Sequence, residues 1–238
     1  MGIVRMGPPT ELVCELRRTF RITKFIESGT FLGDTAYWAS KLFEKVVTIE
    51  RSDSIYRQTK QKYGYINNIE FLYGDTKHKL PEILSNIGAP AIFWLDAHWC
   101  GGQSYGKGDE CPLIQEIETI NKSSYDNFIF IDDARLFMSP PPRPHLIDQW
   151  PDISMISNSL TSVHNGRYIV IIEDVIIAVP IFAKSIVAQY CQQINTKLWE
   201  NCDTTNFRKG LALICQDLKK CVRFPKKIAN NLFNLDRK

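Results

Sequence analysis

Short apolar runs alternate with longer segments of helical period over the first part of the chain. The runs are KFIE at 24–27, KVVTIE at 45–50, IEFLYGD at 69–75, PAIFWLD at 90–96 and NFIFIDD at 127–133. Apolar runs of this length are typical of strands buried on both faces, and the intervening segments space their apolar residues for one helix face. The pattern predicts an α/β three-layer sandwich built on a mostly parallel sheet.

Helix start and stop signals separate these runs. Ser52 or Asp53 can cap a helix that Gly64 ends. Pro81 fits the first turn of a short helix that ends at Gly88, and Pro112 fits the first turn of another. These signals support the alternation of strand and helix.

The pattern changes after residue 133. SPPPRPH at 139–145 is too rich in proline for a helix or a sheet interior, and it predicts a stiff excursion over the carboxyl edge of the sheet. GRYIVIIEDVIIAVP at 166–180 contains two β-branched runs with Glu173 and Asp174 between them, which predicts a C-terminal antiparallel hairpin.

Composition narrows the class of protein. The chain has 238 residues, of which 44% are hydrophobic and 23% charged, so it can bury one sizeable core. The net charge of +3 is modest, and its basic excess lies mainly in LKKCVRFPKKIANN at 218–231, which we interpret as solvated surface, with nucleic-acid binding as the second interpretation. Seven cysteines without dense spacing favour reduced thiols in the cytosol, and no apolar stretch is long enough to cross a membrane.

Each apolar run ends in an acid, and parallel strands bring their carboxyl ends to the edge where such sheets bind ligands. The first loop has the form E-x-G-x-x-x-G, with Glu27, Gly29 and Gly33, in place of the dinucleotide form G-x-G-x-x-G. Its glycines let bare backbone approach a ligand, and its acid suits a ligand that carries positive charge. The alternative for each acid is a cap on the following helix.

Two further acids suit the remaining parts of one cofactor. Glu50 follows Glu27 by 23 residues, where an acid accepts both hydroxyls of a ribose. Asp75 ends the third run, where it can accept a hydrogen bond from an exocyclic amine. Ammonium, ribose and adenine are the parts of S-adenosylmethionine.

These motifs resemble those of the class I S-adenosylmethionine-dependent methyltransferases over residues 24–180. The resemblance implies a Rossmann-like, seven-stranded sheet that ends in the hairpin. Outside this range we expect an N-terminal helical extension at 1–23 and a helical, basic C-terminal extension at 181–238. The resemblance also implies a set of cofactor-binding residues at the strand ends: Glu27, Ser28, Gly29, Thr30, Gly33, Thr35, Glu50, Asp75 and Asp96.

WLDAHW and FIDD hold a second group of acids. Asp96, Asp132 and Asp133 end neighbouring strands about 5 Å apart, and crowded carboxylates repel unless they are protonated or surround a cation. Oxygen ligands suit Mg²⁺, Mn²⁺ or Ca²⁺. The group is similar to the site of metal-dependent O-methyltransferases of the catechol and macrocin types, which implies that these acids bind Mg²⁺ or Mn²⁺. LDAHW is one residue longer than the catechol-type motif, so the place of His98 stays open.

Asp96 and His98 are the candidate catalytic residues. A metal lowers the pKa of an acceptor hydroxyl, and a nearby base, for which His98 is the best candidate, removes its proton. His98 as a packed loop residue is the alternative, and His145 is a second base candidate.

The loop HWCGGQSYGKGDEC at 98–111 has two further interpretations. A structural zinc could bind His98, Cys100, Asp109 and Cys111, but the spacing matches no paired-cysteine pattern. The glycines favour a mobile cover instead. Aromatic residues that line the acceptor pocket or pack in the core are Trp94, Trp99, Tyr105 and Phe137.

The sequence therefore predicts a cytosolic methyltransferase that uses S-adenosylmethionine, a small-molecule acceptor and a divalent metal. O-methylation of a sugar or another hydroxylated metabolite follows from the macrocin resemblance alone. An NAD(P)-dependent oxidoreductase is disfavoured by the missing third glycine and by the hairpin. A non-catalytic nucleotide- or metal-binding module is the other alternative, and a homo-oligomer is compatible with the sequence.

Overall fold

A computed structural model describes residues 7–99, 106, 108–163, 166–200 and 213, and it divides the chain into two compact units, 1–190 and 191–238. The first unit contains the sheet and every residue assigned above to the cofactor or the metal. Cys100, Tyr105 and the basic segment 218–231 lie outside the described residues.

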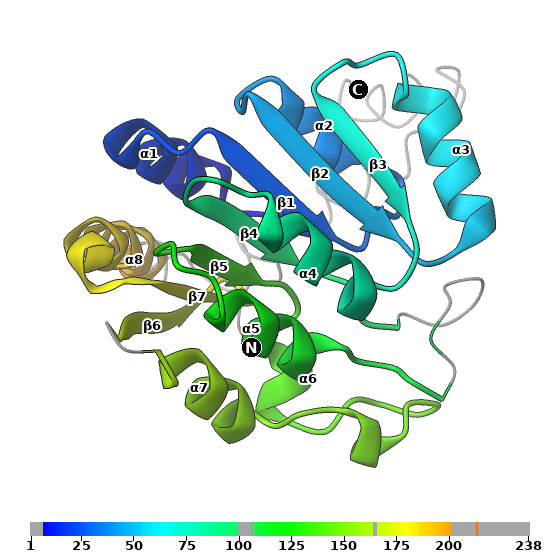
Figure 1. Cartoon of the computed structure of the whole chain (residues 1–238). Coiled ribbons are helices and arrows are strands. Elements are labelled where there is room, and N and C mark those ends of the chain that lie inside the picture. Colours follow the sequence, from blue (N-terminus) through cyan, green and yellow to red (C-terminus); the bar gives the residue numbers. More distant parts are fainter. Residues whose placement is uncertain (1–6, 100–105, 107, 164–165, 201–212, 214–238) are drawn as a thin grey trace, which may run out of the picture. The chain divides into compact units, whose positions relative to one another are not determined.

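The described part of the first unit has one seven-stranded sheet in the order β3-β2-β1-β4-β5-β7-β6 (Figure 1). Strands β1 to β5 are parallel, and β7 pairs antiparallel with both β5 and β6. The Rossmann-like sheet and its hairpin are thus confirmed. Strand order reverses between β1 and β4, which pair directly. The strand bounds are β1 Lys24–Ser28, β2 Lys45–Glu50, β3 Ile69–Tyr73, β4 Ala91–Leu95, β5 Phe128–Ile131, β6 Arg167–Ile172 and β7 Val175–Pro180.

Helices cover both faces of this sheet. One apolar cluster joins α4, α5 and α7 to inward side chains such as Ile26 and Ile129, and Figure 1 shows these helices on one face. On the other face Phe25 packs against Trp38 of α2 and Phe128 against Phe20 of α1. The bounds are α1 Thr10–Phe20, α2 Asp34–Ser40, α3 Asp53–Tyr63, α4 Thr76–Ser85, α5 Leu113–Asn121, α6 Arg135–Met138, α7 Ile153–Thr161 and α8 Lys184–Glu200, with 3₁₀ turns η1 Ile147–Gln149 and η2 Ile181–Ala183.

Most of the predicted helix starts and ends are confirmed, but Pro81 does not lie in the first turn of its helix. Helix α3 ends before Gly64 and α5 begins after Pro112, as expected. Helix α4 begins at Thr76, so Pro81 lies inside it. Asp75 accepts a hydrogen bond from the Lys77 backbone N–H at 2.9 Å and caps the helix ahead of the proline. The missing proline N–H removes one helical hydrogen bond without ending the helix.

The chain after β5 contains the expected hairpin. Glu173 and Asp174 have φ of 47° and 70° and form the tight turn of the β6–β7 hairpin. Residues 139–145 form neither helix nor strand. Within the described part of the chain, every helix is too short or too polar to span a lipid bilayer.

Candidate functional site

The loop between β1 and α2 is shaped by two glycines with positive φ. Gly29 has a φ of 88°, and a Cβ there would stand 2.3 Å from the backbone oxygen of Asp96 at the end of β4. Gly33 has a φ of 75°, and its Cβ would meet Thr59 Cγ2 at 2.5 Å and the Tyr63 ring at 3.1 Å. Packing within the protein therefore requires glycine at both positions. The sequence predicted these glycines for another reason, the close approach of a ligand to the backbone.

Glu27 lies near the end of β1 and is almost fully buried. It accepts a hydrogen bond from Thr48 Oγ1 at 2.5 Å, and Thr48 is joined to Thr30 Oγ1 at 2.6 Å. Burial raises the pKa of Glu27 to about 8; the nearby Asp96 adds to the rise, and hydrogen bonds from Thr48 and Thr35 oppose it. A buried, uncharged carboxyl can ionise when a cation binds beside it.

Glu50 ends β2 and holds the glycine loop in place. Its Oε2 accepts a hydrogen bond from the Phe31 backbone N–H at 3.0 Å, and its Oε1 accepts one from the Ser52 backbone N–H at 2.8 Å. Each carboxylate oxygen has a second lone pair, so Glu50 keeps capacity to accept hydroxyl donors from a ligand.

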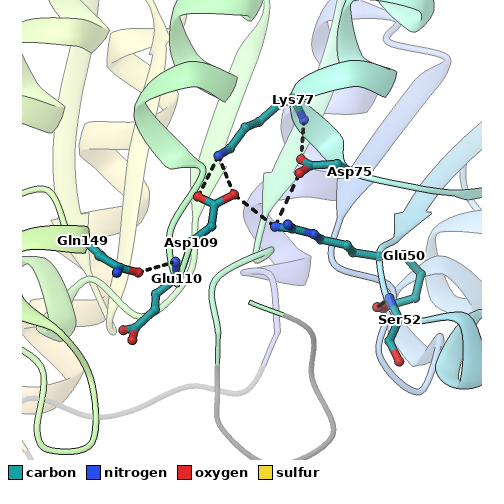
Figure 2. Close-up of polar contacts among 8 residues, drawn as sticks. Glu50, Ser52, Asp75, Lys77, Asp109, Glu110 and Gln149 are labelled. Carbon is teal, nitrogen blue, oxygen red and sulfur yellow. Dashed lines mark hydrogen bonds and ion pairs between the residues drawn. The ribbon is translucent and has the colours of Figure 1, made fainter. Parts of the chain in front are cut away.

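A network of charged side chains joins the ends of β2 and β3 to the connection before α5 (Figure 2). Asp75 caps α4 and lies 3.4 Å from Arg51 Nη1. Asp109 accepts hydrogen bonds from Lys77 Nζ at 2.7 Å and from Arg51 Nη1 at 3.2 Å. Burial opposes ionisation of Asp109, but Lys77 and Arg51 outweigh it, so its pKa lies below the usual value. Asp75 therefore has the role that the sequence analysis gave as the alternative for each acid, a cap on the following helix.

His98 and Asp133 follow the ends of β4 and β5 and form a hydrogen-bonded pair. His98 Nε2 lies 2.8 Å from Asp133 Oδ2, while His98 Nδ1 lies 3.7 Å from Asp96 Oδ1. Asp133 Oδ1 also meets Arg135 Nη1 at 2.7 Å. Burial opposes the charge on Asp133, but His98 and Arg135 outweigh it and keep its pKa below the usual value. Asp133 is thus a charged partner that orients the imidazole.

The other two acids of the predicted metal group have raised pKa values. Burial raises the pKa of Asp96 to about 7, with His98 opposing and Asp132 and Asp133 adding to the rise. Burial likewise raises the pKa of Asp132 to about 6, against the hydrogen bond that its Oδ1 accepts from the Asp133 backbone N–H. Partial protonation of Asp96 and Asp132 therefore reduces the repulsion among the crowded carboxylates. Protonation was one of the two possibilities that the sequence left open, and a bound cation was the other.

These acids do not form a ready set of metal ligands. Both oxygens of Asp133 have nitrogen partners, namely His98 and Arg135, and Asp132 bonds a backbone N–H. Among the residues that the structure describes, no group of three or more His, Cys, Asp or Glu side chains is arranged to hold a metal ion. The described residues therefore contain no preformed site for the divalent metal that the resemblance implies, and none for the alternative zinc ion.

Glu110 ties the proline-rich excursion to the connection before α5. It accepts hydrogen bonds from Trp150 Nε1 at 2.7 Å and from the Leu146 backbone N–H at 3.2 Å, and it lies 3.2 Å from His145 Nδ1. Gln149 Oε1 accepts a hydrogen bond from the Glu110 backbone N–H at 3.2 Å (Figure 2). His145 therefore serves as a structural contact in this arrangement.

Some of the aromatic residues predicted to line a pocket or pack in the core belong to the core, and others lie near His98. Trp94 is buried within β4 and belongs to the core, so it does not line an open pocket. Phe137 and Trp150 pack their rings 6.4 Å and 5.5 Å from the His98 ring. Trp99 packs against His145 at 5.2 Å. Aromatic side chains thus surround the His98 pair.

Sequence reasoning missed several residues of this region. Arg51 directly follows Glu50, and Arg135 lies two residues after Asp133, so their places next to the acids were a usable signal. Glu116 falls between Leu113 and Ile120 on the buried face of α5, where a lone charge is unusual. The sequence around Lys77 and Glu110 contains no local pattern that would indicate their contacts.

The seven-stranded, mostly parallel sheet with its terminal antiparallel hairpin is a Rossmann-like fold that can be compared with solved structures. Solved O-methyltransferase structures share this fold. TomG from Streptomyces achromogenes, a protein of tomaymycin synthesis in complex with SAM, is 14% identical at a TM-score of 0.52, covering 74% of this chain and 82% of TomG.

Two further structures agree. The Bacillus cereus O-methyltransferase in complex with SAH is 17% identical at a TM-score of 0.52, with coverage of 74% and 82%. The SAH-bound Podospora anserina methyltransferase PaMTH1 is 15% identical at a TM-score of 0.51, with coverage of 74% and 80%. Neither the scan against protein-family models nor the search of curated proteins gives a match. At these identities the likeness establishes the fold.

Proposed function

We propose that this chain is an S-adenosylmethionine-dependent methyltransferase that methylates an oxygen atom of a small-molecule acceptor. The observation that carries the proposal is the arrangement of Glu27, Glu50 and the His98–Asp133 pair around the ends of adjacent strands. Glu27 suits the positive part of the cofactor, Glu50 its ribose, and His98 the acceptor. A sugar or another hydroxylated metabolite as acceptor follows from the macrocin resemblance.

The reaction needs alignment and removal of one proton. The acceptor oxygen attacks the methyl carbon, a C–O bond forms, and the C–S bond breaks with its electron pair going to sulfur, which leaves neutral S-adenosylhomocysteine. The acceptor's proton passes to the His98 imidazole, and Asp133 stabilises the resulting charge. No step requires a metal in this scheme. A metal requirement stays a prediction from the resemblance.

Binding and turnover experiments test this function against its alternatives. Calorimetric titration with S-adenosylhomocysteine should give saturable binding, whereas reduced nicotinamide dinucleotide should give none. A panel of hydroxylated acceptors, incubated with S-adenosylmethionine, should include one that releases S-adenosylhomocysteine. Binding of the nicotinamide cofactor alone would favour an oxidoreductase, and cofactor binding without turnover on any acceptor would favour a non-catalytic module.

Replacing Glu50 with alanine should weaken S-adenosylhomocysteine binding by about 1–3 kcal/mol, the range for leaving buried polar partners unpaired. The change removes the acceptor for ribose hydroxyls and frees the Phe31 backbone N–H of the glycine loop. Calorimetry measures the affinity. Glu44→Ala is a matched control, because Glu44 is an exposed acid at the opposite end of β2. Equal affinity of Glu50→Ala and wild type would remove Glu50 from the ribose.

Glu27 should make cofactor binding depend on pH. Its pKa is about 8 in the protein and 4.5 as an ordinary value, so the free site is largely protonated at pH 7. A bound cation favours the charged carboxylate, so binding should release a proton and tighten as pH rises from about 6 to 8. Calorimetry in buffers of different ionisation enthalpy measures this release.

Glu27→Gln supplies the comparison, since it keeps the size of the side chain and removes its charge. The variant should bind about as well as wild type at pH 6 and about 10-fold or more worse at pH 8.5, the range for a lost charge-assisted hydrogen bond. Because the folded pKa is raised, the free wild-type protein should also lose stability as pH rises from about 4.5 to 8. Binding of wild type that is independent of pH would show that Glu27 does not face the cofactor's charge.

A further inference from the structure

Two hydroxyl groups join Glu27 to the glycine loop. Glu27 and Thr48 are register partners on β1 and β2, so their side chains lie on the same face of the sheet. Thr48 Oγ1 donates a hydrogen bond to Glu27 Oε2 at 2.5 Å, and Thr30 Oγ1 lies 2.6 Å from Thr48 Oγ1. The three side chains therefore form one chain of hydrogen bonds that runs from the loop, through β2, to the acid on β1.

The number of hydroxyl protons sets the direction of this hydroxyl chain when Glu27 is ionised. A hydroxyl has one proton to donate, and Thr48 donates its proton to the carboxylate. The proton between the two threonines must therefore come from Thr30. A hydroxyl also accepts hydrogen bonds, so the chain can reverse when Glu27 carries the proton.

The surroundings of Glu27 leave its charge dependent on these donors. All three side chains are buried, so water does not replace the hydroxyls. Burial raises the pKa of Glu27, and the acids Asp96 after β4 and Glu50 at the end of β2 raise it further. Thr48 opposes the rise in pKa more than Thr35 of α2 does. The hydrogen bond from Thr48 is therefore the main contact within the protein that favours the carboxylate.

We propose that Thr48 and Thr30 are positioning residues for Glu27, and that their hydroxyl chain holds its carboxylate in place for a cofactor cation and joins it to the glycine loop. When the cation binds, the carboxyl group of Glu27 releases its proton to the solvent, and the chain directs its donors toward the new charge. The identity of the ligand rests on the proposed function, but the link between Thr48 and Glu27 does not.

Thr48→Val should change how cofactor affinity depends on pH, because valine has the volume of threonine without its hydroxyl. Below the Glu27 pKa of about 8, the free site is protonated, and only the bound state carries the charge that Thr48 stabilises. Well above this pKa both states carry the charge, so the contribution of Thr48 cancels. Affinity for S-adenosylhomocysteine should be about 10-fold or more below wild type at pH 7, and this ratio should fall at least about threefold by pH 9. Comparing the two proteins by calorimetry removes any titration of the ligand itself.

Thr59→Val is the matched control for this substitution. Thr59 is also buried and also contacts the glycine loop, but its hydroxyl donates to the Phe31 carbonyl oxygen at 2.8 Å. Any effect on affinity should be equal at pH 7 and pH 9, because the carbonyl is uncharged. Thr48→Ser keeps the hydroxyl and should retain the wild-type pH profile. A loss in folded Thr48→Val that is equal at both pH values would overturn the proposal, and thermal unfolding of each variant checks the fold.

Thr30→Val tests the second link of the hydroxyl chain. The resemblance placed Thr30 among the cofactor-binding residues, whereas in the structure its hydroxyl contacts Thr48. Loss of that contact should weaken binding about twofold to threefold at pH 7, with the same trend in pH as Thr48→Val, because one hydrogen bond strengthens the next only in part. An equal loss at every pH would show that Thr30 acts on the cofactor directly and would remove it from the chain.

A measurement without cofactor tests the contact with Glu27 itself. Carbon NMR of protein labelled at the glutamate carboxyl groups can identify the Glu27 signal by its absence in Glu27→Gln. Thr48→Val should raise the pKa at which this signal titrates by about 1 or more, and Thr59→Val should leave it near about 8. An unchanged pKa in folded Thr48→Val would refute the link. If wild type binds no S-adenosylhomocysteine, the proposed function fails, and the NMR result still decides whether Thr48 stabilises the Glu27 carboxylate.

Discussion

Replacing Gly29 with alanine is expected to abolish cofactor binding and to lower the free energy of unfolding. A Cβ at this position would stand 2.3 Å from the backbone oxygen of Asp96, and backbone cannot move aside as a flexible side chain can. The positive φ adds about 1–3 kcal/mol of strain for a residue other than glycine. The β1–α2 loop must therefore move away from β4, and Glu27 and the loop then lose their places. Calorimetry with S-adenosylhomocysteine and denaturant unfolding measure the two effects.

Gly88→Ala is the matched control for this substitution. Gly88 also has a positive φ, of 63°, but its Cβ would meet only Lys24 Nζ, at an ordinary 3.8 Å. The control should show the strain of the backbone alone and leave cofactor binding intact. If Gly29→Ala behaves like Gly88→Ala in both measurements, the close approach between the glycine loop and β4 does not shape the site.

Replacing Asp133 with asparagine is expected to lower kcat on the order of 100-fold while S-adenosylhomocysteine affinity changes little. The amide has nearly the shape of the carboxylate but lacks its charge, so it neither stabilises the protonated imidazole nor selects the same tautomer of His98. The hydrogen bond concerned is the 2.8 Å contact between His98 Nε2 and Asp133 Oδ2. A general base contributes about 10²–10⁴-fold to the rate, which sets the scale of the loss.

Asp174→Asn is the control for the Asp133 experiment. Asp174 is a second carboxylate partner of the Arg135 side chain and also accepts a hydrogen bond from the Arg135 backbone N–H, and asparagine tolerates its positive φ. This variant should keep kcat near wild type. Equal losses from Asp133→Asn and Asp174→Asn would mean that the pairing of Arg135 matters and that the His98–Asp133 pair is structural.

The same turnover assays decide whether a metal takes part. Each protein is assayed with EDTA and with added Mg²⁺ or Mn²⁺. Turnover that persists in EDTA would remove the metal that the catechol and macrocin resemblance implied. Turnover restored only by a divalent ion would show that the acids at the ends of β4 and β5 rearrange to bind it, with Asp133 leaving Arg135.

The sequence alone determined the sheet and the edge at which its acids meet. Apolar runs with β-branched and aromatic residues specify buried strands locally, and the turn at Glu173 and Asp174 specifies the hairpin. Strands that run parallel must end at a common edge, so Glu27, Glu50 and Asp96 converge whatever the loops do. These conclusions need only periodicity and chain direction, which a sequence contains.

Only the tertiary structure decided how the charged side chains pair. Arg51 and Asp109 are 58 residues apart, and Lys77 and Asp109 are 32 apart, so no local pattern indicates that they meet. The same holds for His98 and Asp133, which are 35 residues apart. Such contacts depend on the paths of loops and on side-chain rotamers, which are set by packing across the whole unit and not by the spacing of residues along the chain.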